Sequence, residues 1–150
     1  MSTKFENCLK EKLIRKFSRG PALVEKEIEN AVLDIDSAKE SFRKGNYKWT
    51  IIQTYYSMFH SARALLYKKG YREKSHFCLI EAIRNFYVNK GEIGFWLVEA
   101  LQKAKIMREG ADYYGEFTEE NATDLINNAE EFLAKSKKLL QEAENKKRLE

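Results

Sequence analysis

Polar side chains suited to acid–base chemistry and anion binding interrupt an apolar helical pattern near the middle of the chain. Tyr56, His60 and Arg63 are four and three positions apart, so they share one face of a helix. Tyr55 adds a second phenol beside them. A helix that serves only for packing has little use for such a set. The pattern therefore predicts side chains that line a cleft or a dimer interface, or else core residues with satisfied hydrogen bonds.

A second group, Arg72, Lys74, Ser75 and His76, precedes the next predicted helix. Ser75 is a suitable N-cap for that helix. Free N–H groups and the helix dipole make such a terminus favourable for anions. These residues predict either a phosphate site or ordinary capping with solvated basic side chains.

A third group, Arg108, Asp112 and Tyr113, lies around the one irregular segment, residues 110–117. An ion pair of Arg108 with Asp112 would fix this loop. Loops in a helical chain are also common places for functional residues, so a functional role stands beside the structural one.

The sequence contains little that would bind a metal ion or a cofactor. Glu73 and His76 form a Glu-x-x-His spacing, but a di-metal bundle needs this motif on two helices with further glutamates. No glycine-rich phosphate loop is present. Cys8 and Cys78 lack metal-ligand spacing, and we expect both to be reduced. The sequence predicts no metal and no cofactor.

Composition indicates one helical domain that does not cross a membrane. Of the 150 residues, 43% are hydrophobic and 33% charged, with seven glycines and one proline. No apolar run approaches the roughly 20 residues of a membrane span, and no signal core follows Met1, so we expect a cytoplasmic protein.

Charge is distributed unevenly along the chain. Residues 43–108 carry thirteen Lys/Arg and four Glu, a net +9, whereas residues 109–134 carry eight acids and no Lys or Arg, a net −8. The basic region would attract phosphates, or the acidic segment would neutralise it within the bundle.

Apolar residues recur at helical spacing, and no segment reads as a strand. The predicted helices cover residues 4–19, 22–44, 47–69, 76–89, 92–108 and 118 to about 145. Short turns between them predict an all-α, up-and-down antiparallel four- or five-helix bundle with an extra N-terminal helix. We assign residues 1–20 to an N-terminal helical extension and residues 21–150 to the bundle.

The chain resembles the HEPN domain family, in particular its small stand-alone prokaryotic branch, over roughly residues 22–143. The resemblance rests on Tyr55-Tyr56-Ser57-Met58-Phe59-His60-Ser61-Ala62-Arg63-Ala64-Leu65-Leu66, then Gly70, Lys74-Ser75-His76 and Arg108-Glu109-Gly110-Ala111-Asp112-Tyr113. It implies a helical bundle, frequent homodimers, and nucleotide or RNA binding. It also implies a minimal nucleotidyltransferase partner, often in a toxin–antitoxin pair.

Ribonuclease members of that family carry an arginine followed after about four to six residues by a histidine. Arg108 matches the arginine, but Tyr113 stands where the histidine of the shortest spacing would fall, and no histidine follows His76. Tyrosine, with an ordinary pKa near 10, is a poor general base at neutral pH. The sequence therefore favours a binding protein over an enzyme of the usual ribonuclease type.

Three functional hypotheses follow. The first is a toxin–antitoxin-type homodimer that binds a nucleotide, RNA or a nucleotidyltransferase through a basic cleft. Its predicted binding residues are Tyr56, His60, Arg63, Arg72, Lys74, Ser75, His76, Arg108, Asp112 and Tyr113. The second is a metal-independent ribonuclease in which His76 is the acid–base group and Arg108 holds the phosphate. The third is a homodimeric interaction module.

Overall fold

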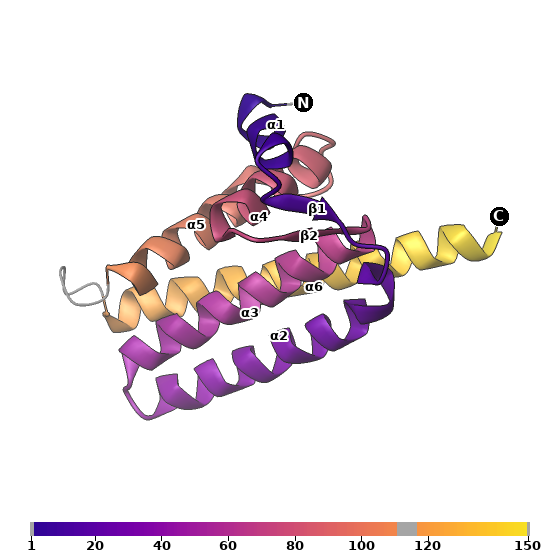
Figure 1. Cartoon of the computed structure of the whole chain (residues 1–150). Coiled ribbons are helices and arrows are strands. Elements are labelled where there is room, and N and C mark those ends of the chain that lie inside the picture. The colour runs from indigo at the N-terminus through magenta and orange to yellow at the C-terminus, as the bar shows by residue number, and fades with distance from the viewer. Residues whose placement is uncertain (1, 111–116, 150) are drawn as a thin grey trace.

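Two long antiparallel helices joined by a tight turn form the base of the molecule (Figure 1). The computed structural model describes residues 2–110 and 117–149. Helix α2 spans Gly20–Arg43 and helix α3 spans Tyr47–Lys68. Gly45 allows the turn because its φ is +74°, and Asn46 caps α3 by accepting a hydrogen bond from the Trp49 N–H at 3.4 Å. These helices match the predicted ranges closely.

Helix α6, Glu119–Leu149, packs along α2 and α3 as the third long helix (Figure 1). Thr118 caps it, accepting a hydrogen bond from the Asn121 N–H at 3.0 Å. Lys68 pairs with Glu144 at 3.1 Å, so the turns of α6 beyond this point project past the end of α3.

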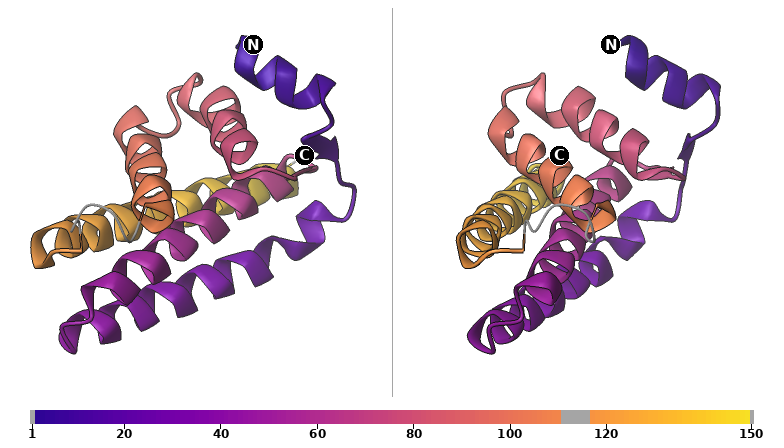
Figure 2. Two further views of the ribbon diagram at one scale, coloured as in Figure 1. Left: turned by 60° about the vertical axis from the view of Figure 1, so that its left-hand side comes forward. Right: turned by 90° about the vertical axis from the view of Figure 1, so that its left-hand side faces the viewer.

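The shorter helices cover the side of α3 that faces away from α2 (Figure 2). Helix α4 spans His76–Ile83, a π-helical segment, η1, follows over Arg84–Val88, and helix α5 spans Phe95–Glu109. Tyr87 in η1 donates to the Leu65 carbonyl at 2.7 Å, which ties this layer to α3.

The core lies around α3, between the long helices on one side and the shorter helices on the other. Its largest fully buried side chains include Tyr55, Phe5, Phe132, Ile51, Met58, Leu65, Leu66, Leu79, Ile83 and Leu101. The predicted all-α bundle is confirmed. Within the described ranges, none of the helices combines the length and apolar character that a membrane crossing requires.

The prediction of a single N-terminal helix over residues 4–19 is wrong. Helix α1 covers only Thr3–Lys10, and Lys12 has a φ of +59°, which ends the helical path. Strand β1, Ile14–Lys16, then pairs antiparallel with strand β2, Tyr71–Glu73. The expectation of no strand therefore also fails, because each strand is three residues long and its partner is distant in sequence. Gly20, predicted to close the first helix, opens α2.

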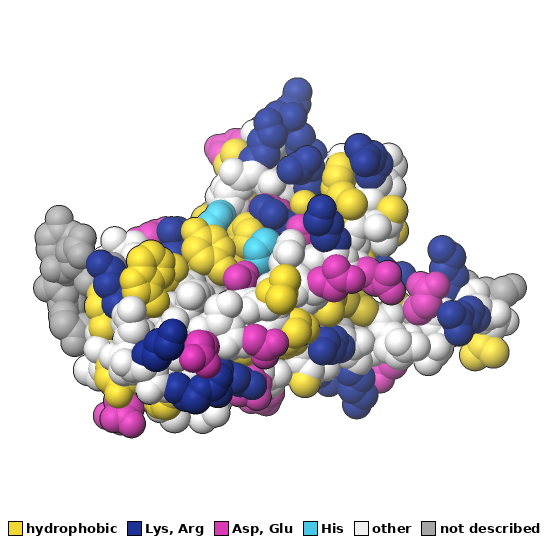
Figure 3. Space-filling model, turned by 90° about the horizontal axis from the view of Figure 1, so that it is seen from below, with side chains coloured by type: hydrophobic (Ala, Val, Ile, Leu, Met, Phe, Trp, Pro, Cys, Tyr) yellow, Lys and Arg dark blue, Asp and Glu magenta, His cyan; other side chains and the backbone are white. Residues whose placement is uncertain are grey.

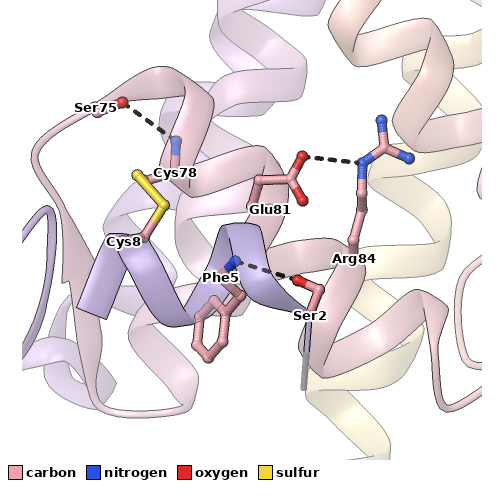
Figure 4. Close-up of a disulfide and its surroundings, with 7 residues drawn as sticks. All are labelled: Ser2, Phe5, Cys8, Ser75, Cys78, Glu81 and Arg84. Atoms are coloured by element: carbon pink, nitrogen blue, oxygen red, sulfur yellow. Dashed lines mark hydrogen bonds and ion pairs between the residues drawn. A yellow bond between two sulfur atoms is a disulfide. The ribbon is translucent and has the colours of Figure 1, made fainter. Parts of the chain in front are cut away.

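The expectation of two reduced cysteines is also wrong, because Cys8 in α1 is bonded to Cys78 in α4 (Figure 4). Both residues are 2% exposed. The Phe5 ring packs edge-on against Phe86 with centroids 5.2 Å apart, which holds α1 on the same layer. Seventy residues separate the cysteines, so their spacing alone did not reveal the contact.

Breaking this bond should destabilise the fold. Closing a loop of this length restricts the unfolded chain, and loss of such a bond typically costs about 2–4 kcal/mol. We expect urea unfolding of the oxidised protein to shift to lower urea by a matching amount when reductant is added. The Cys8→Ser/Cys78→Ser double variant is the control, since its midpoint should ignore reductant. Equal midpoints for the natural sequence in both conditions would mean that the bond contributes nothing.

Candidate functional site

Aromatic and cationic side chains from three helices meet at the surface of α3. We call this set the aromatic–arginine cluster; it comprises Tyr55, Tyr56, Phe59 and Arg63 of α3, His76 of α4 and Arg108 of α5. The start of α4 and the end of α5 both reach this part of α3 and supply the last two residues. Figure 3 shows histidine side chains at the surface of this face beside hydrophobic ones.

His76 is the first residue of α4, and its imidazole packs into the cluster. Ser75 accepts from the Cys78 N–H at 3.2 Å, which confirms the predicted cap and fixes the position of His76. The imidazole lies 4.5 Å from the Phe59 ring, centroid to centroid, and its Nδ1 is hydrogen-bonded to the Tyr55 hydroxyl. Burial lowers the pKa of His76, and the nearby charge of Arg108 lowers it further. The ring is therefore neutral at pH 7.

The bond between Tyr55 and His76 is compatible with a proton on Nε2 of the imidazole. Burial raises the pKa of Tyr55 far above its ordinary value, so the phenol stays protonated and can donate. A phenol that donates to Nδ1 leaves the proton of the neutral imidazole on Nε2. His76 then offers an N–H donor from a ring that is only partly buried.

Within residues 2–110 and 117–149, Arg108 makes few polar contacts that use its charge and its N–H donors. Its guanidinium carbon lies 5.0 Å from the Tyr55 ring centroid and 5.5 Å from that of Tyr56. Nη1 donates to the Tyr56 hydroxyl at 3.4 Å, while Nε is buried without a hydrogen-bond partner among the described residues. Among the described residues its one ion pair is to Glu109, and it is long: 3.9 Å separate Nη2 of Arg108 from Oε1 of Glu109.

Arg63 differs from Arg108 because acidic side chains neutralise it. It contacts Glu73 of β2 at 2.6 Å and Glu27 of α2 at 3.8 Å, and its guanidinium lies over the Phe59 ring at 4.4 Å. Burial alone would lower the pKa of Arg63, but the bond and charge of Glu73 outweigh it and raise the pKa. Arg63 therefore anchors the ring on which His76 rests.

His60 belongs to the same helix face but is held by acids. Its Nδ1 lies 2.5 Å from Glu27 and its Nε2 lies 3.6 Å from Asp34, both on α2. Burial raises the pKa of Asp34, although His60 acts in the opposite direction. His60 thus joins α2 to α3 at the edge of the cluster.

The structure brings together Tyr56, Arg63, His76 and Arg108 of the predicted binding residues and separates others from them. Arg72 points elsewhere, with its guanidinium 4.9 Å from the Phe17 ring, and Lys74 is exposed. Asp112 and Tyr113 lie outside the described residues, and so does any pairing of Arg108 with Asp112.

Sequence reasoning missed the carboxylates that organise this region. Glu27 and Glu73 are buried, and their common partner Arg63 lies 36 positions from Glu27 and ten from Glu73. A glutamate inside an otherwise apolar helical stripe was the available signal for Glu27. Within residues 2–110 and 117–149, no group of three His, Cys, Asp or Glu side chains is arranged to hold a metal ion.

Comparison with known proteins gives consistent matches. The family model for the HEPN domain matches residues 24–140. A Methanocaldococcus jannaschii protein named "putative toxin" is 35% identical over 116 residues, which cover 77% of this chain and 87% of that protein. A second protein of that name from the same organism is 29% identical over 119 residues, covering 78% and 81%. A "UPF0332 protein" of Archaeoglobus fulgidus is 32% identical over 118 residues, covering 76% and 92%.

Replacing Arg108 with glutamine should raise the pKa of His76, because it removes the charge that, after burial, most lowers that pKa. An NMR titration of the imidazole, assigned with a His60→Gln variant, measures the shift. Since the folded state favours the neutral ring, stability falls as pH drops from the ordinary 6.5 toward the lowered value, and Arg108→Gln should lose less over this interval.

Lys103→Gln is the matched control, since Lys103 is exposed on the same helix. It should leave the His76 midpoint in place. A midpoint that stays unchanged in Arg108→Gln as well would show that Arg108 does not act on the imidazole.

Proposed function

Because the chain belongs to the HEPN domain family, we propose that it is a toxin–antitoxin-type protein that binds RNA through the aromatic–arginine cluster. The family match and the two relatives named "putative toxin" support the general class. The observation that carries RNA binding is Arg108, whose Nε has no hydrogen-bond partner among the described residues and which lies beside a neutral histidine and several aromatic rings.

The donors of the cluster suit a phosphate group. A guanidinium is planar and always charged, and it binds phosphate through parallel N–H groups. Arg108 supplies such a group, and the Nε2–H of His76 and the hydroxyl of Tyr56 can add neutral donors. The negative charge of the phosphate would then pair with Arg108, since the other arginine of the cluster, Arg63, is already paired with Glu73.

The aromatic rings suit the bases of a single strand. Proteins that bind single-stranded RNA stack unpaired bases on aromatic faces, next to basic side chains that hold the backbone. Tyr56 is partly exposed within the cluster, and Phe77, which follows His76, is 46% exposed. An RNA strand is therefore a better fit than an isolated inorganic phosphate.

Metal-independent RNA cleavage is the second candidate, because His76 and Arg108 both contact Tyr55. In such cleavage the 2′-hydroxyl oxygen attacks the adjacent phosphorus and the 5′-oxygen leaves. His76 could protonate the leaving oxygen from Nε2 only if its Nδ1 took the Tyr55 proton at the same time, and the raised pKa of Tyr55 opposes that transfer. Arg108 would hold the phosphate. A base must also remove the 2′-proton, and an imidazole already protonated at Nε2 does not supply one. This favours binding over cleavage.

An antitoxin partner, such as a minimal nucleotidyltransferase, or a second copy of the chain belongs to the same proposal. Large hydrophobic side chains remain exposed outside the cluster, among them Trp49, Phe95, Trp96 and Ile106. Exposed aromatic side chains of this kind are enriched in protein interfaces. Of these, Phe95 and Trp96 contact each other with ring centroids 6.0 Å apart and offer a partner an exposed aromatic pair.

Arg108→Gln tests the proposal with a fluorescent single-stranded RNA at low salt and with chelator present. Losing one charged hydrogen-bonded contact should weaken binding about 10- to 100-fold. Arg43→Gln is the control, since Arg43 is exposed near the turn between α2 and α3, and it should bind normally. Undetectable RNA binding by the natural sequence at low salt would end the proposal.

A His76→Gln variant separates binding from cleavage. If the natural sequence cuts RNA in chelator and this variant binds but does not cut, the second candidate is correct. If the natural sequence binds RNA and leaves it intact, the cluster is a binding site.

A further inference from the structure

The two-stranded ribbon formed by β1 and β2 divides its charges between two faces. In the register of the pair, Ile14 lies opposite Glu73, and Arg15 lies opposite Arg72. Ile14 and Glu73 are buried, and Glu73 pairs with Arg63 in α3. Arg15 and Arg72 are exposed, as alternation along a strand requires. The acid is therefore used inward and the cations face outward.

More basic residues surround this arginine pair. Lys74 follows β2, shares the outward alternation of Arg72 and is exposed. Lys16, at the end of β1, is also exposed but shares the alternation of Ile14 and not that of Arg15. We call Arg15, Arg72 and Lys74 the basic ribbon. On the face of the molecule seen in Figure 3, several Lys and Arg side chains lie near the histidines.

Among the described residues, no carboxylate forms an ion pair with the basic ribbon. Like charges directly opposite each other in a sheet destabilise it. Cations elsewhere on the surface do pair, as Lys39 does with Glu130 at 3.3 Å and Lys105 with Glu109 at 2.9 Å. The ribbon thus keeps an unfavourable arrangement that an anion would relieve.

The arginine pair is also held in place. The Nε of Arg15 donates to the Lys12 carbonyl at 3.1 Å, and the guanidinium of Arg72 lies over the Phe17 ring at 4.9 Å. These contacts leave the remaining guanidinium N–H groups available. Two arginines that are held side by side, and that form no ion pair among the described residues, are suited to successive phosphates.

The basic ribbon is joined along the chain to the aromatic–arginine cluster. Strand β2 ends at Glu73, and Lys74 and Ser75 lead to His76. At about 3.3 Å per residue, Lys74 and Arg72 lie roughly 7 and 13 Å from His76 along the extended chain. A strand with one phosphate in the cluster would therefore carry neighbouring phosphates over the ribbon.

We propose that the basic ribbon is a second binding surface for the sugar–phosphate backbone of a single-stranded RNA, continuous with the cluster. This inference rests on the proposed function. No large hydrophobic side chain is exposed among residues 10–19 and 69–74, so the surface lacks the apolar centre of a protein interface. Repeated cations without such a centre are typical of a backbone track that ignores base identity.

The test compares a dinucleotide with one bridging phosphate and a 12-nucleotide RNA, across a salt series. The Arg15→Gln/Arg72→Gln variant should bind the longer RNA about tenfold more weakly at low salt. Its slope of log affinity against log salt should shrink by about 1.4, since each phosphate contact to a single strand contributes about 0.7. Dinucleotide binding should not change, because the cluster is intact.

Two variants serve as controls, and circular dichroism checks that all of them fold. Arg43→Gln/Lys44→Gln removes two charges from the opposite end of α2 and should keep both affinities and the slope. Arg15→Lys/Arg72→Lys keeps the charges and should keep the slope. An unchanged slope in the Arg15→Gln/Arg72→Gln variant would overturn the proposal, as would an equal loss for dinucleotide and long RNA.

This outcome is distinguishable from failure of the proposed function. If Arg108→Gln binds the dinucleotide normally while the ribbon variant loses the long RNA, the cluster assignment fails and the ribbon stands. If the ribbon variant releases the protein from anionic lipid vesicles but binds RNA normally, the ribbon is a membrane contact and the RNA assignment is wrong.

Discussion

The buried ion pair between Arg63 and Glu73 joins the central helix of the bundle to the ribbon, and the rest of the site depends on it. Glu73 has 4% of its side chain exposed, so its charge needs a partner in place. Arg63 provides it, and in return its guanidinium lies over Phe59, against which the His76 ring packs. One ion pair thereby positions an edge of the sheet and one wall of the cluster.

That pair also explains why the two arginines of the cluster are suited to different tasks. Arg63 is matched by Glu73 and Glu27, whereas Arg108 rests on aromatic faces and has one distant carboxylate among the described residues. Aromatic faces attract a guanidinium without cancelling its charge. Positive potential therefore remains at Arg108, and the same potential helps to keep His76 neutral. The charged Arg108 thus lies near the His76 that its own charge helps to keep neutral.

The sequence predicted those features that depend on residues close together in the chain, namely the long helices and a helix cap. The apolar spacing of α2, α3 and α6 gave their ranges, and Ser75 was recognised as a cap because capping acts over three residues. The pairing of β1 with β2 and the bond between Cys8 and Cys78 escaped prediction, since both join segments more than fifty residues apart. Sequence order likewise could not decide whether Arg108 meets His76, because that depends on how α4 and α5 pack on α3.

The separation of Lys74 from the cluster shows how strand periodicity reorganises a basic sequence. Read along the chain, Arg72, Lys74 and His76 form one patch with Glu73 as a partial counter-charge. Pairing with β1 turns Glu73 inward to Arg63 and leaves Arg72 and Lys74 outward, so the acid no longer screens its neighbours. The alternation that buries one carboxylate thereby creates an unscreened cationic surface. A short ribbon of three residues per strand thus adds positive charge beside a site that is built from helices.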